Sequence, residues 1–150
     1  MEKLNILLVE DNPDDQLLAI RAFEQVDRKN KVVVVEDGEQ ALDYLYGTQK
    51  EGAGNERASR LGVILLDIKL PKLNGLEVLK AVRQHPETQW MPVIMFTSSD
   101  EPAEMLEAYR LGANSYIKKP LDYKQFVMQM EVLAKYWLKL NRVPGESLNG

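Results

Sequence analysis

Acidic side chains follow two short hydrophobic runs of the sequence, in a pattern that can bind a cation. The run from Val63 to Leu66 is followed at once by Asp67. The run from Ile6 to Val9 is followed by two acids, Glu10 and Asp11. Short runs rich in valine, isoleucine and leucine are typical of buried parallel strands, and open α/β folds bind ligands at the edge where such strands end. We therefore predict a small acidic site at that edge.

Two further predicted strands are followed by residues of complementary chemistry, Thr97 and Lys119. Clustered carboxylates raise one another's pKa unless a cation is present, and Mg²⁺ suits such a site because it prefers oxygen ligands and keeps several waters. A lysine can hold a phosphoryl oxygen as a point charge, and a hydroxyl can donate a hydrogen bond to another oxygen. Together these groups can support phosphoryl transfer to a carboxylate.

Alternating strands and helices bring these residues to one edge. We expect strands at 4–9, 32–35, 63–66, 93–96 and 115–117. We expect helices at 13–26, 39–46, 75–83, 101–111 and 122–140, and a long polar loop at 47–61. Five strands alternating with five helices imply an α/β fold, a doubly wound parallel sheet covered on both faces. The chain is then one domain over residues 1–140, with a C-terminal tail at 141–150.

Composition excludes several classes of function. Of the 150 residues, 45% are hydrophobic and 28% charged, as in a globular domain, and the net charge of −4 argues against a nucleic-acid-binding surface. No hydrophobic run is long enough to span a membrane, and the absence of cysteine removes thiol chemistry and cysteine-bound zinc. The N-terminal residues enter the first strand directly, so we expect no signal peptide and a cytoplasmic location.

The acidic and basic positions resemble the signature of a known family. Glu10 and Asp11, Asp67 within the string LDIKLPKLNG, Thr97, and Lys119 before Pro120 occur in the order found in response-regulator receiver domains. The resemblance covers roughly residues 4–140 and implies a flavodoxin-like sheet with strand order 2-1-3-4-5. One departure is mild, since Glu10 stands where aspartate is more frequent. Such domains are not enzymes in the usual sense, because they promote only their own phosphorylation and dephosphorylation.

The resemblance also implies a set of roles. Asp67 would accept a phosphoryl group from a histidine kinase, and Thr97 and Lys119 would contact that group. Mg²⁺ would be bound by Asp11, Asp67 and the backbone carbonyl of Lys69, with Glu10 assisting through water.

The switch implied by the resemblance lies at Tyr116, an aromatic residue that turns inward when Thr97 moves. The peptide bond between Lys119 and Pro120 is often cis in the family. We further hypothesise that Lys69 and Ser99, which flank the site, tune the lifetime of the phosphoryl group by admitting or blocking water.

Three strings narrow the resemblance: VEDNPDDQ, EDGEQALDYLYG and FTSSDEPAE. With the long loop, they are similar to stand-alone regulators paired with cyanobacterial and bacterial phytochromes. This likeness implies a phytochrome sensor kinase as partner, while the downstream protein stays unidentified.

We weighed three rival functions. An aspartyl-phosphate phosphatase is disfavoured because it needs a second acid where Lys69 stands. A nucleotide binder of flavodoxin type is disfavoured because no glycine-rich phosphate loop follows the first strand. A receiver-like interaction module that never uses phosphate stays open.

Residues outside the acidic site have structural interpretations. Asp14 and Asp15 are expected to be helix-start charges, and His85 to be structural. In the last helix, a stripe of Phe126, Met130, Leu133 and Trp137 should cover the sheet. Its distal part can form a partner surface, and we expect a homodimer through the fourth and fifth helices and the fifth strand, with a monomer as the alternative.

Overall fold

Five parallel strands form one sheet in the order β2-β1-β3-β4-β5, as the resemblance implied. The computed structural model describes residues 4–47 and 57–144. The strands are β1 (Asn5–Val9), β2 (Val32–Val35), β3 (Leu61–Leu66), β4 (Val93–Thr97) and β5 (Ser115–Lys118). Each predicted strand is confirmed to within two residues of its bounds. All five carboxyl ends therefore meet at one edge.

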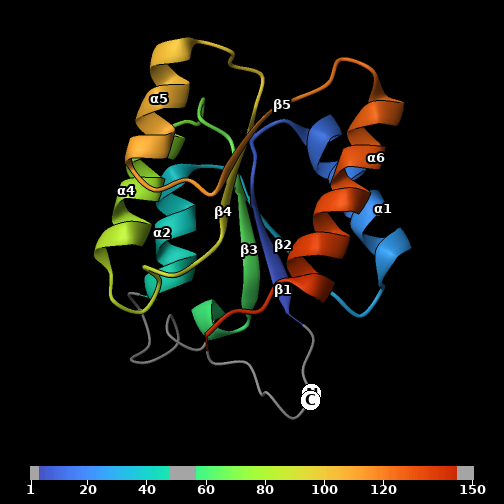
Figure 1. Ribbon diagram of the computed structural model, residues 1–150, viewed down its shortest axis with the longest axis horizontal. Helices are drawn as coiled ribbons and strands as arrows, with labels where there is room; N and C mark the ends of the chain where they lie inside the picture. The colour runs from blue at the N-terminus through green and yellow to red at the C-terminus, as the bar shows by residue number, and fades with distance from the viewer. Residues whose placement is uncertain (1–3, 48–56, 145–150) are drawn as a thin grey trace.

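Helices cover both faces of the sheet (Figure 1). One face carries α2 (Gly38–Tyr46), α4 (Gly75–Gln84) and α5 (Pro102–Arg110). The other carries α1 (Pro13–Val26) and α6 (Tyr123–Ala134), which continues as a π-helix, η1 (Lys135–Leu140). The predicted helix at 122–140 is thus correct in extent, and Asp122 is its N-cap as its residue type favours, but the last six residues have π geometry.

Two hydrophobic cores lie on the two faces of the sheet. The alternation of β3 divides its residues between them, with Ile64 and Leu66 facing α2 and α4, and Val63 and Leu65 facing α1 and α6. The stripe predicted on the last helix is confirmed, because Phe126 and Met130 are buried in the second core and Leu133 and Trp137 pack against it. Every residue of β3 is buried, so the strand is fixed from both sides.

Side-chain caps begin the helices close to the site. Asn12 accepts hydrogen bonds from the backbone N–H groups of Asp14 and Asp15, and Asn74 forms a capping box with Glu77. Each cap satisfies backbone donors that a helix otherwise leaves unpaired, and α1 therefore begins at Pro13, with only its cap Asn12 between it and Asp11.

Two glycines allow close backbone approaches around the loop between β3 and α4. A Cβ on Gly75 would lie 2.0 Å from the backbone oxygen of Asp67, and one on Gly38 would lie 2.3 Å from that of Leu73. No side chain fits at either position without displacing backbone, so the loop is held between Asp67 and the start of α2.

Two expectations need correction. The described residues contain no cis peptide bond, so the bond between Lys119 and Pro120 is trans, the isomer that proline intrinsically favours. The predicted loop at 47–61 is shorter than expected, because residues 57–59 are helical and β3 begins at Leu61; residues 48–56 lie outside the described part of the chain. Most of the predicted tail, 145–150, also lies outside it.

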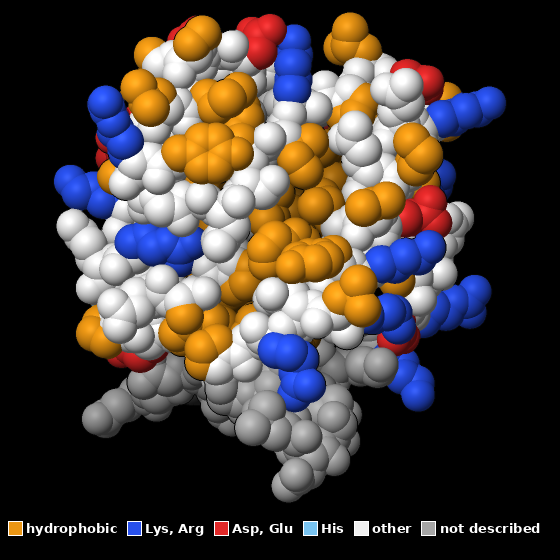
Figure 2. All heavy atoms as spheres, viewed as in Figure 1, with side chains coloured by type: hydrophobic (Ala, Val, Ile, Leu, Met, Phe, Trp, Pro, Cys, Tyr) orange, Lys and Arg blue, Asp and Glu red, His pale blue; other side chains and the backbone are white. Residues whose placement is uncertain are grey.

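One face of the molecule exposes hydrophobic side chains. Figure 2 shows them gathered over its middle, between α5 and α6. The α5 residues Leu106 and Tyr109 are 51% and 49% exposed, and the α6 residue Met128 is 57% exposed. Within the described ranges, no helix combines the length and hydrophobicity needed to span a bilayer.

Candidate functional site

Three carboxylates meet at the carboxyl edge of the sheet. Glu10 and Asp11 follow β1, Asp67 follows β3, and one oxygen of each lies within 4.8 Å of the others. Glu10 and Asp67 are buried, whereas Asp11 is exposed. The predicted acidic cluster therefore exists, with one ligand facing solvent.

Lys119 is the cation that pairs with these acids among the described residues, and its single positive charge offsets one of their negative charges. Its Nζ lies 2.6 Å from an oxygen of Glu10, 2.9 Å from one of Asp67 and 2.9 Å from one of Asp15. Burial by itself lowers the pKa of Lys119, but its carboxylate partners, led by Glu10 and Asp15, raise that pKa further than burial lowers it. The lysine is therefore charged at neutral pH.

Asp15 belongs to the site, which the sequence interpretation missed. Its carboxylate was expected only to complement the dipole of α1. Because α1 begins only a short turn after β1, the third position of this helix lies at the same sheet edge, and Asp15 reaches Lys119 as well. The position of Asn12 as a cap was the signal that fixed this register.

Glu10 has a strongly perturbed carboxyl group. Burial raises its pKa to about 7, even though Lys119 lowers it, and the charge of Asp67 raises it further. Its second oxygen accepts a hydrogen bond of 3.1 Å from the backbone N–H of Asn12. This acid therefore exchanges a proton near neutral pH.

Asp67 is held from several directions. One carboxylate oxygen accepts a hydrogen bond from the backbone N–H of Ile68 at 2.7 Å, and the other accepts one from Lys119 at 2.9 Å. The residue is 5% exposed and its backbone oxygen abuts Gly75. Its side chain is thus oriented into the site with little freedom.

The predicted residues Thr97 and Tyr116 meet at Ser99. The Thr97 hydroxyl accepts a hydrogen bond of 3.2 Å from the backbone N–H of Ser99, and the Tyr116 hydroxyl donates one of 2.9 Å to the Ser99 carbonyl. Burial raises the pKa of Tyr116, so its phenol is protonated and can donate. Thr97 is fully buried at the end of β4. The loop after β4 thus links the two residues.

Lys69 points its ammonium group toward α5. Its Nζ lies 2.9 Å from an oxygen of Glu104, whose other oxygen accepts a hydrogen bond from the Ser99 hydroxyl. Sequence reasoning missed Glu104, because no pattern relates an acid in the first turn of α5 to a lysine 35 residues earlier. The role predicted for the Lys69 backbone carbonyl stays a prediction.

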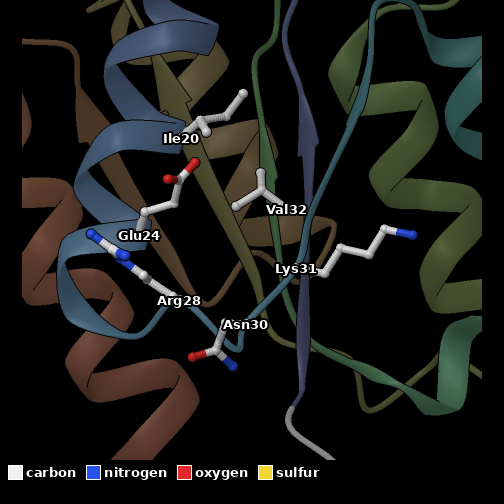
Figure 3. Close-up of a pocket in the computed structure, with 6 residues that line it drawn as sticks. All are labelled: Ile20, Glu24, Arg28, Asn30, Lys31 and Val32. Carbon is white, nitrogen blue, oxygen red and sulfur yellow. The ribbon is translucent and has the colours of Figure 1, made fainter.

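A hollow of about 330 Å³ lies at the opposite edge of the sheet (Figure 3). It opens between α1 and the start of β2, away from the carboxylates. The residues that line it are Ile20, Glu24, Arg28, Asn30, Lys31 and Val32. His85, in turn, ends α4 and stacks on Tyr46 with ring centroids 3.7 Å apart, in keeping with a structural role. Neither feature adds a group to the acidic site.

The sheet order and the acidic edge define a class of signalling domain. The sequence pattern of the response regulator receiver domain matches residues 6–131, and the chain belongs to this family. It is therefore a receiver-domain response regulator of two-component systems, a signalling protein and not a classical enzyme.

Within this family, the chain is similar to particular proteins. The chain is 38% identical over 140 residues to the probable methanogenesis regulatory protein FilR2 of Methanothrix harundinacea, covering 93% of this chain and 87% of that protein. It superposes on the phosphorylated cyanobacterial phytochrome response regulator RcpA with a TM-score of 0.86, 33% identity, and coverage of 97% and 100%.

The Mn²⁺-bound form of response regulator Rcp1, a protein of Synechocystis, gives a TM-score of 0.83 with 29% identity and coverage of 95% and 99%. The predicted likeness to stand-alone phytochrome response regulators is confirmed.

Proposed function

We propose that the chain is a single-domain response regulator that accepts a phosphoryl group on Asp67 from a sensor histidine kinase and signals through protein contacts. The observation that carries this proposal is the placement of Asp67, whose carboxylate lies beside Glu10, Asp11 and Lys119. The receiver domain comprises residues 1–140, followed by a tail at 141–150.

The residues of the site have distinct parts in the transfer. A carboxylate oxygen of Asp67 attacks phosphorus, the bond from phosphorus to the kinase histidine nitrogen breaks, and its electron pair returns to the imidazole. Lys119 already lies 2.9 Å from Asp67, so it can follow the charge onto the phosphoryl oxygens. The switch then involves Thr97. Its hydroxyl oxygen accepts a hydrogen bond from the backbone N–H of Ser99, so the hydroxyl proton stays available to a phosphoryl oxygen.

The donor set fits a hard divalent cation, because it consists of carboxylate oxygens with one exposed member. We propose Mg²⁺, held by Asp11, Asp67 and the backbone carbonyl of Lys69, with Glu10 acting through water. When bound, the cation neutralises charge on the transferring phosphoryl group. Rcp1, similar to this chain, has a Mn²⁺-bound form, which supports a divalent cation.

The sensor is proposed to be a phytochrome histidine kinase. RcpA and Rcp1 support this pairing, since RcpA is a phytochrome response regulator and both match nearly the whole chain. Phosphotransfer from such a kinase should be much faster than from an unrelated histidine kinase, and equal rates would contradict the pairing.

The output surface is proposed to be α5, β5 and α6, where hydrophobic side chains are exposed (Figure 2). Thr97 and Tyr116 both contact Ser99, so a change at the site reaches this face through the loop after β4. We propose that the same face forms a homodimer. Light scattering with and without beryllofluoride tests this, and a strict monomer in both states would contradict it.

Labelling with acetyl phosphate and Mg²⁺ tests the acceptor. We expect one phosphoryl group per chain, and none in Asp67→Ala, because that variant lacks the nucleophile. Asp14→Ala is the matched control, since it removes an exposed acid near the site and should label normally. Persistent labelling of Asp67→Ala would refute the acceptor. A wild-type chain that takes no label, from either acetyl phosphate or kinase, would favour a receiver-like module that works without phosphate.

A further inference from the structure

Glu104 joins the two loops that flank Asp67. Lys69 lies two residues after Asp67 in the loop between β3 and α4, and Ser99 lies two residues after Thr97 in the loop between β4 and α5. One oxygen of Glu104 is 2.9 Å from Lys69 Nζ, and the other accepts a hydrogen bond from the Ser99 hydroxyl. A single carboxylate on α5 thus ties both loops together.

The hydroxyl and carboxylate of this bridge are largely shielded from solvent. Ser99 is 9% exposed, and the Glu104 side chain is 18% exposed. The hydrogen bond from Ser99 and the ammonium of Lys69 hold the pKa of Glu104 below its usual range, so the carboxylate is ionised at neutral pH. The Ser99 carbonyl also accepts a hydrogen bond from the Tyr116 hydroxyl, and this second contact further fixes the loop.

We propose that Glu104 is a positioning residue that prolongs the life of the phosphoryl group on Asp67 by engaging Lys69 and Ser99. The inference rests on the proposed function, and it adds the residue that controls the two side chains flanking the site.

The chemistry at stake is hydrolysis of the acyl phosphate. A water oxygen forms a new bond to phosphorus, the bond between phosphorus and the Asp67 oxygen breaks, and its electron pair returns to the carboxylate. The water proton leaves to solvent, and inorganic phosphate is released. A hydroxyl or an ammonium beside Asp67 can orient that water. Glu104 withdraws both groups from this task, because the Ser99 proton and the Lys69 ammonium are directed toward its own oxygens.

Loss of the bridge frees both side chains. Glu104→Gln keeps the size of the side chain but removes its charge, so it weakens both contacts. We expect the phosphoryl group to be lost about threefold to tenfold faster, a range set by the strength of a hydrogen bond to a charged group and of an exposed ion pair. The full chain is labelled with acetyl phosphate and Mg²⁺, freed of reagent, and followed by the decay of the label.

Glu107→Gln is the matched control, since it removes an exposed acid from the same helix. The effect of Glu104→Gln should disappear when Lys69→Met and Ser99→Ala are already present, because no group is then left to be freed. A purely structural role for Glu104 would persist in that background.

The outcomes separate the two proposals. A labelled wild-type chain whose Glu104→Gln variant decays no faster than Glu107→Gln overturns the role of Glu104 alone. Acceleration that survives in the Lys69 and Ser99 variant background also overturns it. A wild-type chain that takes no label overturns the proposed function, and the role of Glu104 falls with it.

Discussion

Lys119 and Lys69 both contact acids around Asp67, but their surroundings give them different properties. Lys119 is 11% exposed and lies within 2.9 Å of three carboxylates, whereas Lys69 is 62% exposed and, within the described part of the chain, forms an ion pair with Glu104. A buried charge depends on its partners, because water cannot replace them. An exposed charge is largely hydrated and contributes little to stability. The comparison teaches that two lysines can differ in their contribution to stability because they differ in burial and in the number of carboxylates they contact.

The largest effect is expected for Lys119→Met. Without its ammonium, buried carboxylates repel one another, and the free energy of unfolding should fall by roughly 3 kcal/mol in a chelator. Phosphorylation by acetyl phosphate should slow about 100-fold, as when one charge-stabilising donor is removed from an active site. Urea unfolding and label incorporation measure the two effects.

The neighbouring Lys118→Met is the matched control, because Lys118 is 55% exposed and pairs only with Asp100 among the contacts of the described residues. Equal losses in the two variants would show that burial of Lys119 is not the cause.

An intermediate effect is expected from the titration of Glu10. The pKa of its carboxyl is raised from 4.5 to about 7 by burial, so the folded chain binds more protons than the unfolded chain between these values. This contribution to stability is present at low pH and is lost as pH rises toward the folded pKa, by roughly 3 kcal/mol in total. In a metal-free buffer, the free energy of unfolding of the wild type, relative to that of Glu10→Gln, should therefore fall as the pH rises from 4.5 to 7 and stay constant above pH 7. A difference that does not vary with pH would contradict the raised pKa.

The smallest effect is expected for Lys69→Met. Its ion pair is exposed, so the urea midpoint should stay within error of the wild-type value. The same unfolding experiment measures it. A loss of stability comparable with that of Lys119→Met would remove the contrast between the two lysines.

Local signals in the sequence were sufficient for the elements of the fold. The hydrophobic runs placed all five strands, and Asn12 and Asp122 act as the helix caps that their residue types favour. The strand order came from the family resemblance, since no local pattern states which strands are neighbours.

The acidic cluster was predictable because residues that follow parallel strands share one edge. Asp15 and Glu104 were not, because their contacts depend on where a helix face lies after packing. The π geometry of η1 was not predicted either; in this segment Trp137 packs on the core while Tyr136 and Leu140 are exposed.

The close approaches at Gly38 and Gly75 have a mechanical consequence for signalling. The loop after Asp67 is closely packed at both ends. The Asp67 carbonyl leaves no room for a side chain at Gly75, and the Leu73 carbonyl leaves none at Gly38, the first residue of α2. A packed element of this kind transmits displacement instead of absorbing it. When Asp67 is phosphorylated as proposed, we therefore expect the tightly packed backbone on the α2 side to resist displacement and the loop after β4 to pass it toward the exposed hydrophobic face of α5 and α6.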